Sequence, residues 1–528
     1  MPTDAVFKAK ARRIANGLPP RFMDLFAGCG GLSLGFVTAG CELVASVEMD
    51  PFAAATHGAN FAAMSLGTNT QAHHKPRDVT KETPGSIFAD LGINGPVDAQ
   101  IDLMVGGPPC QAFARIGRAK LRHEAHRRKQ DDADTAFLVD GRVNLWRRYL
   151  HYVRETKPIA LVLENVPDML NHGGTNIAES VAEHLRKEGY RARYTLLNAA
   201  WFGVPQMRER MFLIGVHESL DTDPIFPAPT HFTTLPAGYE STRSSARKVI
   251  NHVPGHEEHG HRWVMDPSLG QGLPATTTAE QALADLPKIH TIDRHNNVLV
   301  HGGKKDPAEP CAYTSTSPTT PWSTLMRQWP RFDARETTTG HVIRFLPRDF
   351  KFFKAMDEGW QYPDIHRFVE DKRQELLMAR HNRGHPVDGR TTEGKEFHRE
   401  WTIPYDVSKF ANKWWKLYHD KPVRTLMAHL GKDSYSHIHY DSEQARTISV
   451  REAARLQSFP DGFKLIRSMN PAFKQIGNAV PSLLAYAIAM AIRDTIGCQH
   501  IKDIRCDLLK LDRRLITTTS GGINRCAS

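Results

Sequence analysis

Regularly spaced apolar runs in the first 215 residues are the feature that most constrains the fold of this chain. Short apolar segments recur at residues 22–26, 43–47, 101–105, 159–163 and 211–215, and polar or helix-forming stretches separate them. Segments of this length are typical of buried β-strands. Their alternation with helical stretches predicts an α/β fold, doubly wound around a mostly parallel sheet.

The rhythm ends near residue 216, which suggests a change of domain. Residues 216–446 mix Pro, Thr, His and aromatic residues with scattered Arg and Lys, and we expect a second, irregular domain there. A helical pattern returns at residues 449–458 and 482–496, where Pro481 and Ser482 are typical of a helix start. We therefore expect domains at 1–215 and 216–446, a helical segment at 447–500 and a loose tail at 501–528.

Charge and cysteine content narrow the class of protein. The chain has 528 residues, and 68 Lys and Arg against 58 Asp and Glu give a net charge of +10, which favours polyanions such as nucleic acid. Seven cysteines without paired spacing resemble neither a disulfide framework nor a zinc site, so we expect a reducing compartment. No apolar run follows the N-terminus as in a secretory signal. The apolar run at 482–492 is shorter than the ~20 residues that span a bilayer, so we expect a buried helix and no membrane.

A glycine-rich turn after the first apolar run predicts a nucleotide-like ligand. Gly28 and Gly30 let backbone N–H groups approach a ligand where a helix begins. Glu48 ends the second strand, where a carboxylate accepts hydrogen bonds from both ribose hydroxyls. Ser33 stands where a dinucleotide fingerprint has its third glycine, which favours an adenosine ligand without a pyrophosphate. A tight turn that binds nothing would show the same glycines.

Nucleophile, acid and cations converge on the same sheet edge. Cys110 follows two prolines that stiffen the loop after the third strand, at the end where open α/β sheets bind substrates. Glu164 ends the fourth strand, and Arg208 and Arg210 precede the fifth. A lone cysteine is usually an inert small apolar residue, and a charged turn is often only solvated. Their shared position favours a thiolate nucleophile instead.

The chain resembles the DNA cytosine-5 methyltransferases, of the bacterial restriction-modification type. The resemblance is carried by motifs in a fixed order over most of the chain: residues 24–31, Glu48, and residues 77–79, 108–111, 164–166, 206–210, 451–460 and 475–481. It implies the S-adenosylmethionine-dependent methyltransferase fold, with the last motif folded back beside the first. Residues 216–446 then correspond to the family's target-recognition domain.

The resemblance implies covalent catalysis on cytosine. Cys110 adds to carbon 6 of the ring and makes carbon 5 nucleophilic toward the methyl group of S-adenosylmethionine. Loss of that methyl group converts the cofactor to S-adenosylhomocysteine. Glu164, holding a proton, bonds N3 and the exocyclic amine, while Arg210 stabilises the carbonyl oxygen. Arg208 and Arg210 also favour the thiolate of Cys110. The base that removes the carbon 5 proton is left open, with water as a candidate, and the target base must flip out of the duplex.

The same resemblance gives the cofactor site. Phe26 corresponds to the aromatic residue that stacks on adenine, Glu48 to the ribose ligand and Asp78 to the contact of the adenine amine. The expected set comprises Phe26, Gly28, Gly30, Glu48, Met49, Asp78, Val79, Pro109, Leu145 and Asn478, of which Leu145 rests on spacing. We expect no metal, because the histidines at 252, 256, 259 and 261 lie in what resembles an exposed loop.

The expected partner is double-stranded DNA. Basic residues alternate with aromatic ones in a candidate phosphate-contacting and base-reading surface: Arg327, Trp329, Arg331, Arg344, Phe345, Arg348, Phe350, Lys351, Phe352, Phe353 and Lys354. Single members could equally be local core or solvated surface. A bacterial cytoplasmic, nucleoid-associated monomer is expected, which protects host DNA with a possible cognate restriction endonuclease.

Three alternatives stay open. An amino-directed methyltransferase would have Asp or Asn before the two prolines, and this chain has Gly107 there. The tRNA-methylating branch shares the catalytic motifs but has a much shorter recognition region. A DNA-binding homologue without catalysis would not need Cys110, Glu164 and Arg210 together.

Overall fold

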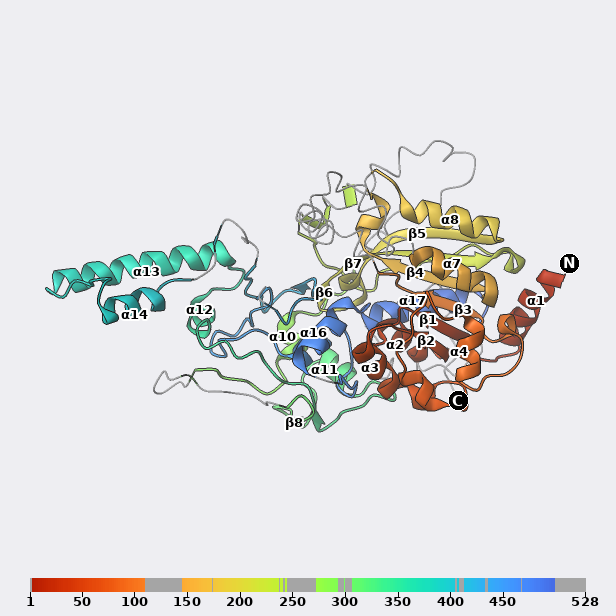
Figure 1. Cartoon of the computed structure of the whole chain (residues 1–528), viewed down its shortest axis with the longest axis horizontal. Helices are drawn as coiled ribbons and strands as arrows, with labels where there is room; N and C mark the ends of the chain where they lie inside the picture. Colours follow the sequence, from red (N-terminus) through yellow and green to blue (C-terminus); the bar gives the residue numbers. More distant parts are fainter. Residues whose placement is uncertain are drawn as a thin grey trace.

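A six-stranded sheet forms the centre of the larger lobe in the computed structural model (Figure 1). Its strands are β1 (Arg21–Leu25), β2 (Glu42–Val47), β3 (Leu103–Gly106), β4 (Ala160–Asn165), β5 (Tyr190–Asn198) and β7 (Glu209–His217), in the order β2-β1-β3-β4-β7-β5. Neighbours from β2 to β4 are parallel, and β7 is antiparallel to both β4 and β5. The mostly parallel α/β fold is therefore confirmed. Strand β5 was not among the expected strands, and the direction of β7 was not predicted.

The structure describes most of the chain. The described residues are 2–109, 145–172, 174–236, 238–240, 243–244, 272–292, 299, 306–403, 406–407, 413–432, 435–466 and 468–498. Cys110 and the histidines at 252, 256, 259 and 261 lie outside them.

Helices accompany the sheet because each crossover between parallel strands needs a connection of a dozen or more residues. They are α1 (Pro2–Ala15), α2 (Gly31–Thr38), α3 (Pro51–Phe61), α4 (Pro84–Asp90), α7 (Leu145–Thr156) and α8 (Ile177–Lys187). Short 3₁₀ turns connect several of them: η1 (Ala62–Met64), η2 (Thr70–His74), η3 (Val97–Ala99), η5 (Pro167–Leu170), η6 (Ala199–Phe202) and η7 (Glu218–Leu220). The sheet strands contribute mostly buried side chains, as their continuous apolar runs require.

The end of the described chain packs against its beginning. Helix α17 (Ser482–Thr495) lies along α2, and the Arg493 guanidinium donates to the carbonyl of Ala39 at 2.6 Å. Gly35 permits this close approach, because a Cβ there would lie 2.5 Å from Ala485. The stretch from Met469 to Thr495 is long and apolar enough to cross a membrane, but 89% of its most apolar window is buried inside the protein. Residues between α16 (Met469–Asn478) and α17 also break it into two helices.

Residues 216–446 contribute to two hydrophobic cores. Helix α11 (Pro321–Arg327) and Trp329 join the core of the sheet, and the Trp329 indole N–H donates to Thr38 Oγ1 at 3.0 Å. A second core surrounds α12 (Phe350–Ala355) and Trp414. The same region contains α10 (Ala279–Leu283), β8 (Cys311–Ala312), β9 (Thr337–Thr338) and β10 (Val423–Arg424). Strand β8 pairs with β9, and β10 pairs with β6 (Gln206–Met207).

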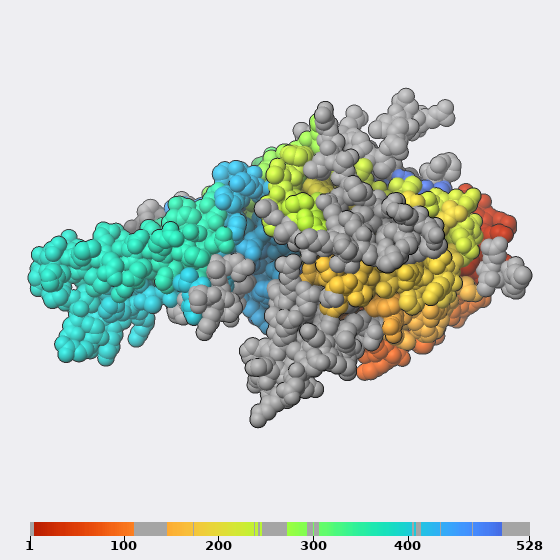
Figure 2. All heavy atoms as spheres, turned by 90° about the horizontal axis from the view of Figure 1, so that it is seen from above, coloured from red at the N-terminus to blue at the C-terminus, as the bar shows by residue number. Residues whose placement is uncertain are grey.

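A helical arm projects from the second core, away from the sheet (Figures 1 and 2). It consists of α13 (Tyr362–Asn382) and α14 (Thr392–Glu400). Only the start of α13 is buried, whereas α14 packs through Phe397 and an ion pair of 2.9 Å between Arg380 and Glu393. This regular arm was not expected in a region of irregular composition.

Several members of the expected DNA-contacting surface are buried, so that part of the prediction is wrong. Arg327 is 1% exposed and donates to the carbonyls of Ser315, Thr316 and Arg335. Trp329, Phe350, Phe352 and Phe353 are buried in the two cores. Large aromatic side chains gain more from filling a core than from facing water, so alternation with cations alone does not identify a surface.

Buried ion pairs join α15 (Val450–Leu456) to the rest of the molecule. The Arg446 guanidinium forms two hydrogen bonds of 2.7 Å with the Glu452 carboxylate. Arg455 pairs with both Asp285 and Asp461. These groups are almost inaccessible to water, and such charges are tolerated in an interior only when they are paired.

Candidate active site and cofactor cavity

A cavity of about 830 Å³ opens at the carboxyl ends of the parallel strands. Its volume lies in the range of small-molecule sites. Twelve of the fourteen predicted site residues line it: Phe26, Gly28, Glu48, Met49, Asp78, Val79, Pro109, Leu145, Glu164, Arg208, Arg210 and Asn478. Gly30 does not line it, and Cys110 lies outside the described residues. Gly30 is in the left-handed region, with φ of 104°, and a Cβ there would lie 2.4 Å from the Phe61 ring. Its requirement for glycine is therefore explained by packing.

Glu48 is held rigidly beside the glycine turn. One carboxylate oxygen accepts the N–H of Gly28 at 2.9 Å, and the other accepts the N–H of Asp50 at 2.7 Å. Burial raises the pKa of Glu48, although these two N–H donors oppose the shift. Each oxygen retains a further lone pair. The carboxylate is therefore oriented to accept two hydroxyl groups from a ligand.

A buried polar network lies under the same turn and was not predicted. Ser33 Oγ donates to Asp24 at 2.6 Å and lies 3.0 Å from His57 Nε2. Burial raises the pKa of Asp24 to about 7 and lowers the pKa of His57 to about 3. Ser33 was interpreted only as a missing glycine, and no spacing rule links it to His57.

Asp78 is brought to the same cavity as Glu48. The N–H of Arg77 donates to the Glu48 carbonyl at 2.7 Å. The buried Arg77 guanidinium pairs with Glu82 and Asp90. Hydrogen bonds from the N–H and hydroxyl of Thr80 to one oxygen of Asp78 lower its pKa. Asp78 is therefore an anchored carboxylate at one wall of the cavity.

Glu164 and Arg210 form an ion pair that lines the same cavity. The Arg210 Nε atom lies 3.1 Å from the Glu164 carboxylate, and both side chains are largely buried. Burial raises the pKa of Glu164, because desolvation outweighs the attraction of Arg210 and Arg208. A Cβ at Gly107 would lie 2.7 Å from the same carboxylate, which explains the glycine before the two prolines.

The loop that leads to Cys110 is fastened to the next strand. The side-chain amide of Asn165 donates to the Pro108 carbonyl at 3.2 Å. Gly107, Pro108 and Pro109 all line the cavity. The residue before Cys110 is thus placed at the cavity wall.

Arg208 is engaged by backbone carbonyls. Its guanidinium donates to the carbonyl of Leu426 at 2.9 Å and to that of Gly477 at 3.0 Å, and the side chain is 1% exposed. Leu426 follows β10, and Gly477 precedes the cavity residue Asn478. Arg208 therefore connects the segment after β10 to the end of α16. Its predicted action on the thiolate of Cys110 stays a prediction.

Gln206, which was not assigned a role, completes this connection. Its side-chain oxygen accepts the N–H of Leu426 at 2.9 Å, and its amide donates to the carbonyl of Leu456 at 3.1 Å and to Gln457. Gln457 in turn donates to the Ala479 carbonyl at 2.5 Å. The one sequence signal for a role of Gln206 is its position at the start of residues 206–210, which contain both Arg208 and Arg210.

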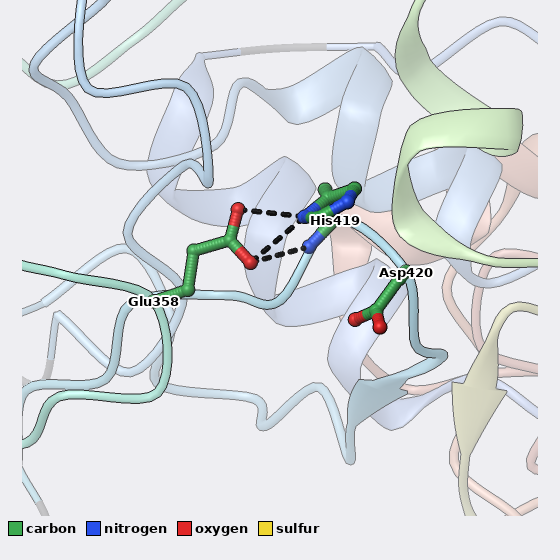
Figure 3. A group of neighbouring side chains, drawn as sticks. All are labelled: Glu358, His419 and Asp420. Atoms are coloured by element: carbon green, nitrogen blue, oxygen red, sulfur yellow. Dashed lines mark hydrogen bonds and ion pairs between the residues drawn. The ribbon is translucent and has the colours of Figure 1, made fainter.

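One group of possible metal ligands occurs among the described residues. Glu358, His419 and Asp420 offer atoms within 4.8 Å of one another, and His419 and Asp420 are exposed (Figure 3). Glu358 and His419 face each other and form an ion pair of 2.9 Å, which raises the pKa of His419. None of the three lines the large cavity. The pair satisfies its own charge, and we assign no metal to it.

Known proteins are similar to this sequence over almost its whole length. A model of C-5 cytosine-specific DNA methylases matches residues 20–494. M.OihORF3336P of Oceanobacillus iheyensis, named as a type II methyltransferase, is 36% identical over 91% of this chain and 97% of its own length. The type II methyltransferase M.AgeI of Thalassovita gelatinovora is 29% identical over 90% of this chain and 99% of its own. DNA (cytosine-5)-methyltransferase 1 of Mus musculus is 26% identical over 92% of this chain but only 29% of its own.

A solved structure supports the fold. A crystal structure from E. coli, described as a prophage-encoded DNA modification methyltransferase, has a TM-score of 0.55 and 20% identity, over 90% of this chain and 99% of that one. The function of this E. coli protein and that of M.OihORF3336P are themselves assigned by inference. The match of the family model, together with the 36% identical relative, identifies the chain as a member of the C-5 cytosine-specific DNA methylase family, the DNA (cytosine-5-)-methyltransferases.

Proposed function

We propose that this DNA cytosine-5 methyltransferase acts on a cytosine flipped out of double-stranded DNA, through a covalent bond between Cys110 and carbon 6. The observation that carries the proposal is one cavity that is lined both by the ion pair of Glu164 and Arg210 and by the turn that holds Glu48. A base pocket and a donor pocket are therefore continuous. Such continuity suits transfer of a group between two bound molecules.

The cavity fits S-adenosylmethionine in its chemistry. The Glu48 carboxylate, fixed by two backbone N–H groups, suits the ribose hydroxyls, and Asp78 suits the adenine amine. Phe26 offers a ring for stacking on the base, and Asn478 and Leu145 line the same cavity. When bound, S-adenosylmethionine supplies the electrophilic methyl group.

Glu164 supports the chemistry on the base. Its raised pKa lets the carboxyl hold a proton at a higher pH than an ordinary glutamate, so that it donates to N3 of cytosine. Arg210 orients that carboxyl and places positive charge where electron density accumulates on the ring. Cys110 forms the bond to carbon 6, the methyl group is added at carbon 5, a proton leaves carbon 5, and the bond to sulfur then breaks.

Base flipping follows from the burial of Glu164. Its side chain is 13% exposed and lines the same cavity as Pro108 and Pro109. A base stacked in a duplex cannot reach such a group. The target cytosine must therefore leave the helix to meet Glu164.

The biological setting is the second half of the proposal. The chain spans nearly the full length of two relatives named as type II methyltransferases. That likeness supports protection of host DNA in a bacterial cytoplasm, with a cognate restriction endonuclease and with residues 216–446 as the target-recognition domain. We propose a monomeric enzyme, because one chain contains the whole cavity.

Methyl transfer tests the proposal directly. Tritiated S-adenosylmethionine should label duplex DNA and leave transcribed tRNA unlabelled. Cys110→Ala should abolish the labelling, whereas substitution of the buried Cys311 on β8, Cys311→Ala, should retain it. Label on tRNA alone, or full activity of Cys110→Ala, contradicts the proposal.

Two further measurements separate its parts. DNA with 5-fluorocytosine at the target has no removable proton at carbon 5, so it should trap a complex that survives denaturing electrophoresis. Purely reversible complexes would contradict the covalent step. Bisulfite sequencing of DNA from cells that express the chain identifies the target word, and challenge of that DNA with endonucleases that cut the word tests protection.

A further inference from the structure

Helix α7 contacts the backbone of the cavity wall through one arginine, Arg148. Arg148 donates from both Nε and Nη2 to the carbonyl of Val79, at 3.2 and 3.0 Å. Val79 is buried and lies between two other cavity residues, Asp78 and Thr80. Arg148 itself is not part of the cavity lining. It therefore acts on the cavity only through the backbone that it holds.

The helix that presents Arg148 is itself fixed to the sheet. The Tyr149 hydroxyl donates to the carbonyls of Met104 on β3, at 3.1 Å, and Val162 on β4, at 2.9 Å. One turn after Arg148, the Tyr152 hydroxyl donates to the Glu82 carbonyl at 2.9 Å. The segment 79–82 is thus attached to a rigid helix at both ends.

The first turn of the same helix also lines the cavity. Leu145, the first residue of α7, is a cavity residue, and Arg148 follows it by three positions. Residues three apart on a helix lie on one face. The contact between Arg148 and Val79 therefore fixes the gap between Leu145 and the turn that carries Asp78.

The contact also determines which acceptor a ligand finds there. Two N–H donors from a guanidinium occupy the Val79 carbonyl, so that oxygen is poorly placed to accept a further bond from a ligand. One oxygen of Asp78 already accepts two hydrogen bonds from Thr80. The other lies 3.5 Å from Lys81, whose side chain is 79% exposed, and remains accessible.

We infer that Arg148 is a positioning residue for the adenine half of the cofactor, which directs recognition of the adenine amine to Asp78 by holding Val79 and Leu145 at a fixed separation. The inference rests on the proposed use of S-adenosylmethionine at this cavity. Arg148 touches neither ligand nor reacting atoms, so its loss should affect binding of the adenosine part more than the chemical step.

Three variants test the inference. Arg148→Met removes both donors and keeps an apolar stem, and Arg148→Lys keeps the charge but cannot reproduce the fork of two N–H groups. Arg147→Met is the matched control, because Arg147 is exposed and its guanidinium lies over the Trp146 ring, 5.3 Å from the centroid. Binding of S-adenosylhomocysteine and of 5′-methylthioadenosine is measured by calorimetry, and KM and kcat by methyl transfer.

Arg148→Met should raise the KM for S-adenosylmethionine about tenfold, with kcat within about twofold of the native value. The Kd values of S-adenosylhomocysteine and 5′-methylthioadenosine should rise by the same factor, because both contain the adenosine part. Arg148→Lys should fall between native protein and Arg148→Met, and Arg147→Met should match native protein.

Other outcomes overturn the inference. Native KM and Kd values in Arg148→Met contradict it, and so does a fall in kcat with no change in KM. A loss for S-adenosylhomocysteine without a loss for 5′-methylthioadenosine places the effect at the wrong half of the ligand. Failure of the proposed function is separate: native protein that binds S-adenosylhomocysteine but methylates no DNA refutes that function and leaves the Arg148 comparison valid.

Discussion

Substitution of Arg208 distinguishes a role in catalysis from a role in holding two distant chain segments together. Its guanidinium donates to the carbonyls of Leu426 and Gly477, at 2.9 and 3.0 Å, from a site that water does not reach. A hydrogen bond to a charged group contributes a net ~1.5–3 kcal/mol, so loss of both in Arg208→Met should cost roughly 3–6 kcal/mol of unfolding free energy. That is a large part of the ~5–15 kcal/mol that stabilises a typical domain.

The lysine variant gives the discriminating result. Arg208→Lys keeps the positive charge, but its compact ammonium group cannot donate to both carbonyls. About half of the unfolding free energy lost in Arg208→Met should therefore also be lost in Arg208→Lys. If Arg208 acted mainly by favouring the thiolate of Cys110, Arg208→Lys would instead resemble native protein in stability and activity. The structure predicts that both variants are less stable than native protein, and that Arg208→Met is less stable than Arg208→Lys.

Urea denaturation and thiol reactivity together provide the assay. The urea midpoint reports stability, and the pH dependence of alkylation by iodoacetamide, with Cys110→Ala as the blank, reports the pKa of the Cys110 thiol. Arg210→Met is the matched control, since Arg210 pairs with Glu164 and should lose activity with a smaller change in stability. A native urea midpoint in Arg208→Met, together with slower alkylation, would refute the structural role.

Three other substitutions have definite expected outcomes. Burial raises the pKa of Asp24 in the folded state to about 7, so the free energy of unfolding should fall by up to roughly 4 kcal/mol as pH rises from about 4 to 7. Asp24→Asn should flatten this dependence of unfolding free energy on pH in denaturation curves, and an unchanged dependence contradicts the shift. Gly35→Ala should cost about 1–3 kcal/mol in urea denaturation, because its Cβ meets Ala485 at 2.5 Å, whereas Gly85→Ala, with 3.4 Å to its nearest neighbour, should not destabilise; equal effects would refute the packing argument. Glu48→Gln should weaken S-adenosylhomocysteine binding in calorimetry by tenfold or more through loss of charge-assisted hydrogen bonds, while unaltered affinity removes Glu48 from the ribose site.

The sheet could be anticipated from sequence where strands are buried on both faces. Strands β1 to β4 form continuous apolar runs, and each matches an expected segment within two residues at either end. Strand β5 was missed because Arg191 and Arg193 interrupt it, both facing outward to pair with Asp221 and Asp223. The direction of β7 could not be anticipated, because side-chain periodicity is the same in parallel and antiparallel strands.

The sequence motifs predicted which residues share the cavity better than they predicted the contacts of those residues. Motif positions brought Glu48, Asp78 and Glu164 to one cavity, since strand ends share one edge of a parallel sheet. The partners of Arg208 are 218 and 269 residues away in sequence, and no local pattern specifies contacts over such a separation. Arg327 was misplaced for the same reason, because burial depends on the neighbours that the tertiary fold supplies.

The packing of α17 on α2 has a consequence for the synthesis of this protein. These helices are separated by about 450 residues, so at a translation rate of ~5–20 residues per second a ribosome needs roughly 20–90 s to pass from one to the other. During that interval the face of α2 that carries Gly35, which meets Ala485 in the folded protein, has no native cover from α17. The nascent chain is thus exposed to aggregation until α17 emerges, and a premature stop before residue 482 would leave the glycine turn before α2 on an unfinished core.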